Sequence, residues 1–454
     1  MNNHSSAAEK FIHNEDRVNW HDKALWFVRE KRDVAASSVK GWEELRTLAA
    51  AIKAHTLSHL DEYLLQFEHE ASANGARVHW AMNAEEHNEI VYNILRSRST
   101  TLAVKSKSML TEECGLNHFL ERKGIEVVDT DLGERIVQLA NEPPSHIVMP
   151  AIHKKREEID ELFHHHLNTE RSGGNAEYLA REARKHLREK FLSAGAAMTG
   201  VNFAIAETGA VVVCTNEGNA DMGVHAAPLH IACMGMEKII PTTEHLGVFL
   251  RLLARSATGQ PITAYTSFYR KPKPGCEMHI VIVDNGRSEQ LARENFRSSL
   301  RCIRCGACMN TCPVYRRSGG YSYGFTIPGP IGSILSPGID VKKYGSLPFA
   351  STLCGSCSDV CPVKIDIHAQ LYAWRQIIST RHGASIGKRM IMSVAGIMFS
   401  HPALFRAAGI GGNFLQKVLP PVLINSAVRR WTKQRDLPEA PVQTFSQWYK
   451  KRKT

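Results

Sequence analysis

Seven cysteines crowd into one stretch of this 454-residue sequence, at spacings that suit metal chemistry. They form two groups, Cys302-x2-Cys305-x2-Cys308-x3-Cys312-Pro313 and Cys354-x2-Cys357-x3-Cys361-Pro362. Three thiolates on a tight loop at this spacing bind one iron–sulfur cubane, and the cysteine before the proline binds the neighbouring cluster. Tetrahedral zinc is the alternative, but zinc sites use two separated cysteine pairs, which this run does not provide. The spacing therefore predicts two [4Fe–4S] clusters.

The cross-over of the fourth cysteine assigns each thiolate to a cluster. Cluster one takes Cys302, Cys305, Cys308 and Cys361, and cluster two takes Cys312, Cys354 and Cys357. Cluster two is then one thiolate short, and Ser351 stands where the missing cysteine would be. We expect either a [4Fe–4S] cluster with a non-cysteine fourth ligand near Ser351 or a [3Fe–4S] cluster.

Each cysteine group contains a glycine and is followed directly by a proline. Gly306 and Gly355 are expected to let backbone amides approach the cluster sulfurs, and Pro313 and Pro362 to end the preceding helical turn. The 41 residues between the groups are nearly uncharged and rich in glycine and proline. A shield over the clusters and a long ordered loop are both open interpretations of this insertion.

The cysteines need a scaffold, and the residues before them predict one. Residues 18–73 carry apolar side chains near helical spacing, and from about Ala76 short strands alternate with helices, as in a mostly parallel sheet covered on both faces. The expected strands are Arg77–Ala81, Thr101–Val104, Glu126–Asp129, His146–Val148, Thr263–Phe268 and Met278–Val283, with a hairpin of Val201–Ala206 and Ala210–Cys214. The expected helices are Ala84–Arg96 after an Asn83 cap, Glu112–Arg122, Lys154–His166, His245–Ala254 and Ser288–Leu300.

Other polar and sulfur-bearing residues are weaker candidates for chemistry. Glu207, Asn216, Glu217 and Asn219 lie on or beside glycine turns of the α/β region. They either form a polar pocket with Glu217 as acid or base, or simply serve the turns, and the second interpretation is preferred. We expect His164–His166 to be a solvated helix end. The remaining cysteines, predicted to be small buried hydrophobes, are Cys114, Cys214, Cys233 and Cys276.

Composition excludes several classes of protein. Hydrophobic residues make up 43% and charged residues 22%, which is ordinary globular usage. The polar N-terminus has no apolar region typical of a secretory signal, and the uncharged run Met390–Phe405 is shorter than the ~20 residues of a spanning helix. No Rossmann or Walker A motif is present. We expect a cytoplasmic electron conduit with no nicotinamide, flavin or nucleotide site of its own.

Positive charge is concentrated at the C-terminus. The formal net charge is +11, and the last 74 residues hold thirteen basic residues and two acidic ones. Trp431, Trp448 and Tyr449 adjoin basic positions in this tail, and Val418–Ile424 is apolar. Three interpretations of this tail are open: it docks on an acidic partner subunit, it contacts the inner membrane peripherally, or it is a solvated extension. Docking on a partner subunit is the preferred interpretation. Nucleic acid is not expected, because no binding motif accompanies the charge.

Several short motifs add to the cysteine pattern. They are Pro143–Val148, Thr215–Asn219, Asp284–Ser288, Pro328–Gly332 and Ser351–Cys354. In combination they resemble the lactate-utilisation protein B family, whose members are ferredoxin-like subunits of a three-component bacterial system that oxidises L-lactate. The resemblance spans nearly the whole chain.

The resemblance implies a fold and a function. It implies an α/β LUD domain, similar to the NagB/RpiA/CoA-transferase group, followed by an α-helical ferredoxin-type dicluster domain and a basic C-terminal region. The expected bounds are 1–73 for an N-terminal helical segment, 74–295 for the LUD domain, 296–372 for the dicluster domain and 373–454 for the C-terminal region. It also implies two [4Fe–4S] clusters, partners of the A and C types, and electron transfer from L-lactate as it becomes pyruvate.

Other functions stay open. Ferredoxin-like subunits of glycolate or other 2-hydroxy-acid oxidases share the cysteine portion. Alternatively, the LUD domain is itself catalytic on a small acid or thioester, and the clusters serve it. Turnover by the isolated chain distinguishes these classes, and no residue is assigned a catalytic role.

Overall fold

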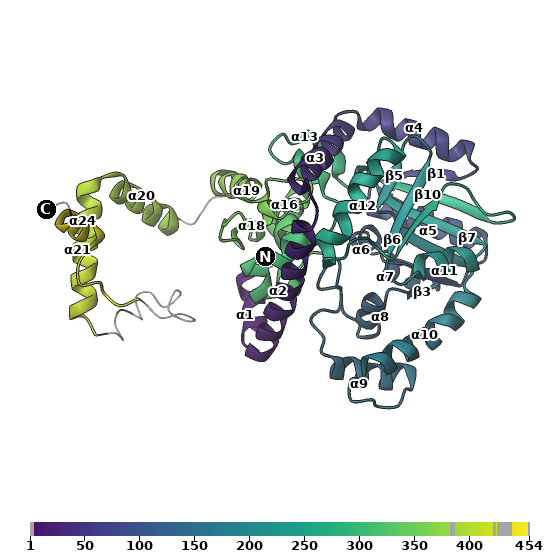
Figure 1. Cartoon of the computed structure of the whole chain (residues 1–454), viewed down its shortest axis with the longest axis horizontal. Coiled ribbons are helices and arrows are strands. Elements are labelled where there is room, and N and C mark those ends of the chain that lie inside the picture. Colours follow the sequence, from purple (N-terminus) through teal and green to yellow (C-terminus); the bar gives the residue numbers. More distant parts are fainter. Residues whose placement is uncertain (1–3, 382–385, 421–423, 425–437, 453–454) are drawn as a thin grey trace. The chain divides into compact units, whose positions relative to one another are not determined.

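Four helices make up the N-terminal part of the chain. The structure is a computed structural model that describes residues 4–381, 386–420, 424 and 438–452, and it divides into two compact units, Met1–Ile378 and Ser379–Thr454. The first helices are α1 (His4–Ile12), α2 (Glu15–Ser37), α3 (Trp42–Ser58) and α4 (Leu60–Ala73) (Figure 1). The Asn14 side chain caps α2 by accepting a hydrogen bond from the Arg17 backbone N–H. The predicted helical start is confirmed.

A six-stranded parallel sheet forms the centre of the α/β region, which confirms the predicted fold class. Its order is β1-β10-β7-β4-β2-β3, and every pairing is parallel. The strands are β1 (Arg77–Ala81), β2 (Leu102–Lys105), β3 (Glu126–Asp129), β4 (Ala196–Gly200), β7 (Leu229–Gly235) and β10 (Glu277–Val283). The sequence predicted the strands at both edges and missed β4 and β7, which are buried along their whole length. A fully buried strand shows no alternation of apolar and polar residues.

Helices between the strands flank this sheet, and one of them, Arg156–Leu167, packs mainly on two neighbouring helices rather than on the strands (Figure 1). They are α5 (Ala84–Ser97), α6 (Met109–Glu113), α7 (Leu116–Arg122), α8 (Leu132–Leu139), α9 (Arg156–Leu167), α10 (Ala176–Ser193) and α11 (Asn219–Ala226). Asn83 caps α5 as predicted, by accepting from the Glu86 N–H. The predicted helix over Glu112–Arg122 is wrong, because Gly115 adopts a φ of +65° and separates α6 from α7.

A second, four-stranded sheet contains the predicted hairpin. Its order is β8-β5-β6-β9, with β5 (Phe203–Ile205), β6 (Ala210–Thr215), β8 (Ile239–Ile240) and β9 (Tyr265–Tyr269). Gly209 turns the hairpin with a φ of +65°, and a Cβ there would lie 2.2 Å from the Ala71 backbone nitrogen. The predicted strand Thr263–Phe268 corresponds to β9, which pairs with β6. It therefore belongs to this sheet and not to the parallel one. The short helix η1 (Met236–Lys238) leads into β8, and α12 (Thr243–Thr258) follows it.

Short helices carry the two cysteine groups. They are α13 (Arg287–Ala292), η2 (Arg297–Arg301), α14 (Ala307–Thr311), α15 (Pro313–Ser318), η3 (Gly320–Tyr323), α16 (Gly329–Ile339), α17 (Val341–Tyr344), η4 (Leu347–Phe349), α18 (Ser356–Asp359) and α19 (Ile367–Arg381). The predicted helix over Ser288–Leu300 is interrupted where Arg293 leaves helical geometry, with a ψ of 102°. The insertion between the cysteine groups is largely helical, and most of α16 is buried.

The C-terminal unit contains the helices α20 (Ile386–Ser400), α21 (Pro402–Val418) and α24 (Phe445–Lys451). Its basic residues Arg429, Arg430, Lys433 and Arg435 and the tryptophan Trp431 lie outside the described residues. No described helix is by itself long and apolar enough to cross a membrane. The segments Arg389–Ser400 and Pro402–Val418 meet that test only together, and they are bent by 109°. Helix α21 buries none of its residues.

Candidate iron–sulfur centres and the adjoining pocket

The first cysteine group lies on a tight loop between η2 and α14. Cys305 and Cys308 are buried, and the Arg304 backbone N–H points toward the Cys302 Sγ at 3.4 Å. Gly306 has a φ of +76°, and a Cβ there would lie 3.0 Å from the His146 Cε1. This position needs glycine because of its backbone conformation and because a histidine approaches it.

Cys361 joins the first group across the fold. Cys302, Cys305, Cys308 and Cys361 line one small cavity whose other walls are almost entirely apolar. Four cysteines in apolar surroundings are the donor set that a [4Fe–4S] cluster takes, so the residues present fit that group. Among the described residues, no three or more His, Cys, Asp or Glu side chains are arranged to hold a single metal ion.

Three thiols of this cavity, those of Cys305, Cys308 and Cys361, have a raised pKa and are protonated in the metal-free chain. Burial raises the pKa of Cys361 to about 11, and the nearby positive charge of Arg46 opposes this shift. Burial also raises the pKa of Cys305 and Cys308. Metal binding must therefore displace protons from these cysteines, as thiolate ligation generally does.

The second cysteine group is more open. Cys357 is buried and Cys354 is exposed, and Gly355 between them has a φ of +82° with open space where a Cβ would stand. Burial, together with Cys312 and Cys354 nearby, raises the pKa of Cys357 to about 12. The Tyr315 backbone N–H points toward the Cys312 Sγ at 3.5 Å. The negative charge of Cys354 raises the pKa of Cys312, and the charges of Cys312 and Cys354 raise the pKa of Cys357. The three cysteines therefore lie near one another.

Ser351 lies in a turn before Cys354. Its Oγ accepts a hydrogen bond from the Leu353 N–H at 3.0 Å, and its carbonyl accepts one from Arg375 at 2.6 Å. A local role in the turn accounts for both contacts. Its role as a cluster ligand stays a prediction.

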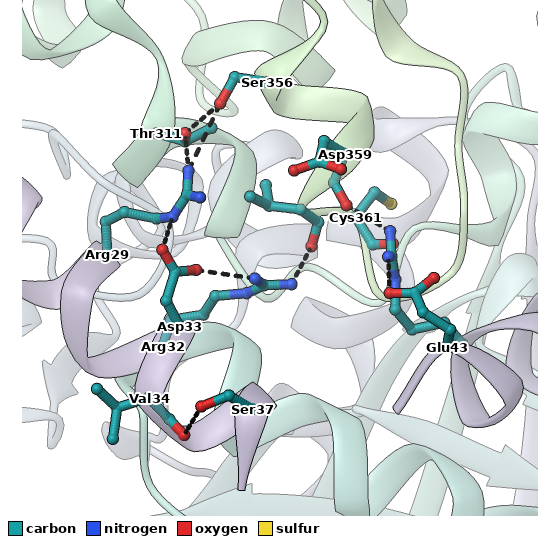
Figure 2. A network of polar contacts seen from close by, with 12 residues as sticks. Arg29, Arg32, Asp33, Val34, Ser37, Glu43, Thr311, Ser356, Asp359 and Cys361 are labelled. Carbon is teal, nitrogen blue, oxygen red and sulfur yellow. Dashed lines mark hydrogen bonds and ion pairs between the residues drawn. The ribbon is translucent and has the colours of Figure 1, made fainter. Parts of the chain in front are cut away.

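Three arginines of the N-terminal helices contact the cysteine groups, and none of them was predicted from the sequence; Figure 2 labels two, Arg29 and Arg32. Arg32 donates to the Val360 carbonyl at 3.1 Å, and Arg46 donates to the Cys361 carbonyl at 2.8 Å and 3.1 Å. Arg29 contacts Thr311 and Ser356, one from each cysteine region. The spacing of Arg32 in the sequence could have indicated its burial. It shares the buried face of α2 with Leu25 and Ala36, at helical spacing.

The motif Pro143–Val148 connects the sheet region to the first cysteine group. The Tyr315 hydroxyl donates to the Ser145 carbonyl at 2.7 Å, and the His146 Nε2 pairs with the Asn310 Oδ1 at 3.0 Å. Burial lowers the pKa of His146 to about 3, so the ring is neutral. Its Nδ1 accepts the N–H groups of Val148 and Met149. These local bonds make a bend, so the predicted strand His146–Val148 is wrong.

A pocket of about 290 Å³ lies at the carboxyl ends of the parallel strands. Residues that follow four different strands line it: Lys107 after β2, Asp131 after β3, Asn202 after β4 and Lys238 after β7. Cys305 also lines it. The same cysteine therefore borders both this pocket and the cavity of the first cysteine group.

Three of the four polar candidates of the α/β region line this pocket. Asn216, Glu217 and Asn219 do so, whereas Glu207 accepts the Thr243 N–H at the start of α12 and does not. The Glu217 carboxylate accepts the Leu132 N–H at 3.1 Å. Partial burial and the neighbouring Asp131 raise the pKa of Glu217 to about 7. Glu217 therefore faces a cavity and contacts the start of α8, which is distant in the sequence, rather than a backbone group of its own turn.

The remaining candidates lie away from these sites. His165 and His166 are exposed at the end of α9, as predicted for a solvated helix end, whereas His164 is half-buried and its Nδ1 bonds to the Thr169 carbonyl at 2.6 Å. Cys114 and Cys233 are buried among apolar side chains of one core cluster. Cys214 and Cys276 are only partly buried, so the prediction of burial is wrong for them.

Three protein families match successive parts of the chain. The LUD domain matches residues 64–289, and the 4Fe–4S dicluster domain matches residues 298–365. The family described as lactate utilisation protein B, C-terminal, matches residues 375–454. Together the matches run from the fourth helix to the end of the tail.

Curated relatives match nearly the whole chain. Lactate utilization protein B of Bacillus cytotoxicus is 43% identical over 435 residues, which cover 92% of this chain and 90% of that protein. The same-named protein of Bacillus pumilus is 44% identical, with coverages of 93% and 92%. An Escherichia coli protein named "uncharacterized electron transport protein YkgF" is 42% identical, with coverages of 90% and 88%.

One solved structure is weakly similar. It is the crystal structure of a DUF162 family protein from Deinococcus radiodurans, which is 14% identical and aligns with a TM-score of 0.28. The alignment covers 49% of this chain and 98% of that protein.

Proposed function

Because the chain belongs to the lactate utilization protein B family, we propose that it is the iron–sulfur electron-transfer subunit of a multi-component system that oxidises L-lactate to pyruvate. The observation that carries this proposal is the cavity lined by Cys302, Cys305, Cys308 and Cys361. Three of these cysteines come from the first group and one from the second, as the ferredoxin spacing requires. When bound, a cluster at such a site accepts and releases single electrons.

The proposal includes both predicted ligand sets. Cluster one is held by the four cysteines of that cavity, and cluster two by Cys312, Cys354 and Cys357. Shared electrostatic surroundings support the second set, since Cys312 and Cys354 both raise the pKa of Cys357. Ser351 or another non-cysteine group near it completes cluster two, unless that cluster is [3Fe–4S].

The protein's own residues prepare the first site for negative charge. Arg32 and Arg46 are nearly buried and donate to the backbone carbonyls of Val360 and Cys361, respectively. Their positive charges lie close enough to lower the pKa of Cys305 and Cys361, against the larger effect of burial. A fixed cation beside buried thiolates favours the more negative, reduced state of the site.

The proposed partners are the A-type and C-type subunits of the lactate utilization system. The C-terminal unit provides the surface for them, because its helices expose large apolar side chains: Ile391, Val394, Phe399, Phe405, Ile410 and Phe414. Exposed apolar side chains at this density mark interaction surfaces. Truncation after Thr380 should abolish co-purification with the partner subunits and leave both clusters intact. If the truncated chain still assembles but leaves the membrane fraction, the surface serves the inner membrane instead.

A second candidate function is catalysis by the LUD domain on a small acid or thioester. The pocket at the carboxyl ends of the strands favours it, since such crevices are common ligand sites in α/β folds. In that case the chain is a catalytic or co-catalytic part of an L-lactate dehydrogenase, or of a glycolate or other 2-hydroxy-acid oxidase.

One experiment separates these functions. The full chain is reconstituted anaerobically with iron and sulfide, and cluster reduction is followed by EPR after addition of L-lactate. We expect reduction only when the A-type and C-type partners are present. Reduction by L-lactate in the isolated chain would establish the catalytic alternative, and faster reduction by glycolate would point to a different 2-hydroxy acid.

A further inference from the structure

The pocket beside Cys305 is lined by charged side chains of both signs. The basic ones are Lys107, Lys238, Arg287 and Arg304, and the acidic ones are Glu113, Asp131, Glu217 and Glu237. Arg287 is compensated within the fold, because it donates to Glu237 at 2.6 Å and to both oxygens of Glu113 at 3.1 Å. Lys107 donates to the Val148 carbonyl at 2.7 Å.

Lys238 and Arg304 are less well paired. Among the residues that the structure describes, no hydrogen bond or ion pair reaches the Lys238 ammonium. The Arg304 Nη1 is buried without a hydrogen-bond partner, and its Nη2 is 3.8 Å from a Glu237 oxygen that must also balance Arg287. Glu237 is thus shared among Arg287, Lys238 and Arg304, so these cations favour a further, bound anion.

Neutral polar groups that line the same pocket indicate which other chemical groups the ligand carries. The Thr215 Oγ1 is buried and has no hydrogen-bond partner, and it lines the pocket. The side-chain oxygen of Asn202 accepts the Cys214 N–H at 2.9 Å, which leaves its amide N–H groups as donors. A hydroxyl or carbonyl group next to an anionic group satisfies these positions better than an anion alone.

We infer that this pocket binds a small 2-hydroxy- or 2-oxocarboxylate, with Lys238 and Arg304 receiving the carboxylate and Thr215 the neighbouring oxygen. The volume of about 290 Å³ is at the lower end of ligand pockets, which suits a small acid. The inference rests on the proposed function for the choice among small anions.

The position of the pocket gives such binding a consequence. Cys305 and Ile147 line both the pocket and the cavity of the first cysteine group. A ligand bound there lies against a proposed ligand of cluster one, whereas none of the cysteines proposed for cluster two lines this pocket. Occupancy of the pocket should therefore alter the EPR spectrum of cluster one and leave that of cluster two unchanged.

Calorimetric titration of the reconstituted full chain with pyruvate, and separately with L-lactate, tests the inference. We expect saturable binding of at least one acid, weakened at least tenfold by Lys238→Met and less strongly by Thr215→Val, since one charge-assisted contact has that effect. Lys271→Met, at an exposed lysine outside the pocket, is the matched control and should bind like the unaltered chain. Iron content of each variant verifies that it is folded.

Three outcomes would overturn the inference. They are no binding of either acid by a chain with intact clusters, unchanged affinity in the Lys238→Met variant, and equally tight binding of inorganic phosphate in competition with pyruvate. Each differs from failure of the proposed function, in which the clusters are not reduced by L-lactate and the partner subunits although the acid still binds.

Discussion

The two cysteine groups share a spacing but differ in their surroundings. The first lies against the sheet region and the N-terminal helices, where a Cβ on Gly306 would meet His146 at 3.0 Å. At the equivalent Gly355 of the second group, a Cβ would meet nothing within 4 Å, and the adjacent Cys354 is exposed. The same cysteine spacing therefore stands in two different environments. The first group is enclosed and borders a pocket, whereas the second leaves Cys354 exposed.

The largest effect that tests this comparison comes from the crossing cysteines. Cys361→Ala should remove cluster one and spare cluster two, because its thiol faces the cavity of the first group. Cys312→Ala should do the opposite. Iron and sulfide content with EPR of the reduced protein checks both variants. The reverse pattern would contradict the ligand sets.

A large effect is also expected on oxidation. In the proposed ligand set, cluster two has three motif thiolates, one of them from the exposed Cys354, so mild oxidation should release one iron and produce a [3Fe–4S] EPR signal of about one spin per chain or less. Ser351→Cys should suppress that signal. An unchanged signal would show that the missing ligand comes from elsewhere.

A smaller effect distinguishes two arginines, one for each group. Arg46 is buried and donates to the carbonyls of Cys361 and Asp359, so Arg46→Met should lower the free energy of unfolding by about 3 kcal/mol. Arg375 donates to the Pro348 and Ser351 carbonyls from a half-buried position, and Arg375→Met should cost about 1 kcal/mol. Denaturant unfolding under anaerobic conditions measures both. Equal losses of unfolding free energy in the two variants would show that the enclosure of the first group adds little to stability.

The smallest effect concerns pH at the pocket rim. Burial and Asp131 raise the pKa of Glu217 from 4.5 to about 7, with Lys107 and the Leu132 N–H acting in the opposite direction. Between pH 6 and 8 the side chain gains a negative charge, so pyruvate should bind several-fold more weakly at pH 8 than at pH 6. Glu217→Gln should flatten this dependence. A slope that persists in Glu217→Gln would assign it to another group.

The raised pKa of Glu217 also makes the free energy of unfolding depend on pH. Below pH 4.5 the folded and unfolded chains both hold the Glu217 proton, so the group contributes no difference. From pH 4.5 to about 7 the unfolded chain releases it first, and stability falls as pH rises; above that range the loss is constant. Because Glu217 is only partly buried and solvent screens its charge, the loss should be on the order of 1 kcal/mol or less. Glu217→Gln should remove it in denaturant unfolding measured at pH 5 and pH 8.

Local patterns predicted much of the scaffold. Strands β1, β2, β3 and β10 and the cap of α5 follow from short-range signals in the sequence. The central strands β4 and β7 were missed because both of their faces are buried, which removes the alternation that marks a strand. The interruptions at Gly115 and Arg293 depend on backbone conformations that an apolar pattern does not report.

By itself, the sequence determined which chemistry the chain can hold, because the spacing of cysteines along a loop limits how their thiols can converge. Only the tertiary structure decided what surrounds that chemistry. Arg32 and Arg46 precede Cys361 by more than 300 residues, and Lys238 and Cys305 meet in one pocket although they lie on separate elements. Such neighbours arise from the packing of helices and from strand ends that share one edge of a sheet, and these depend on the whole fold rather than on any local run of residues.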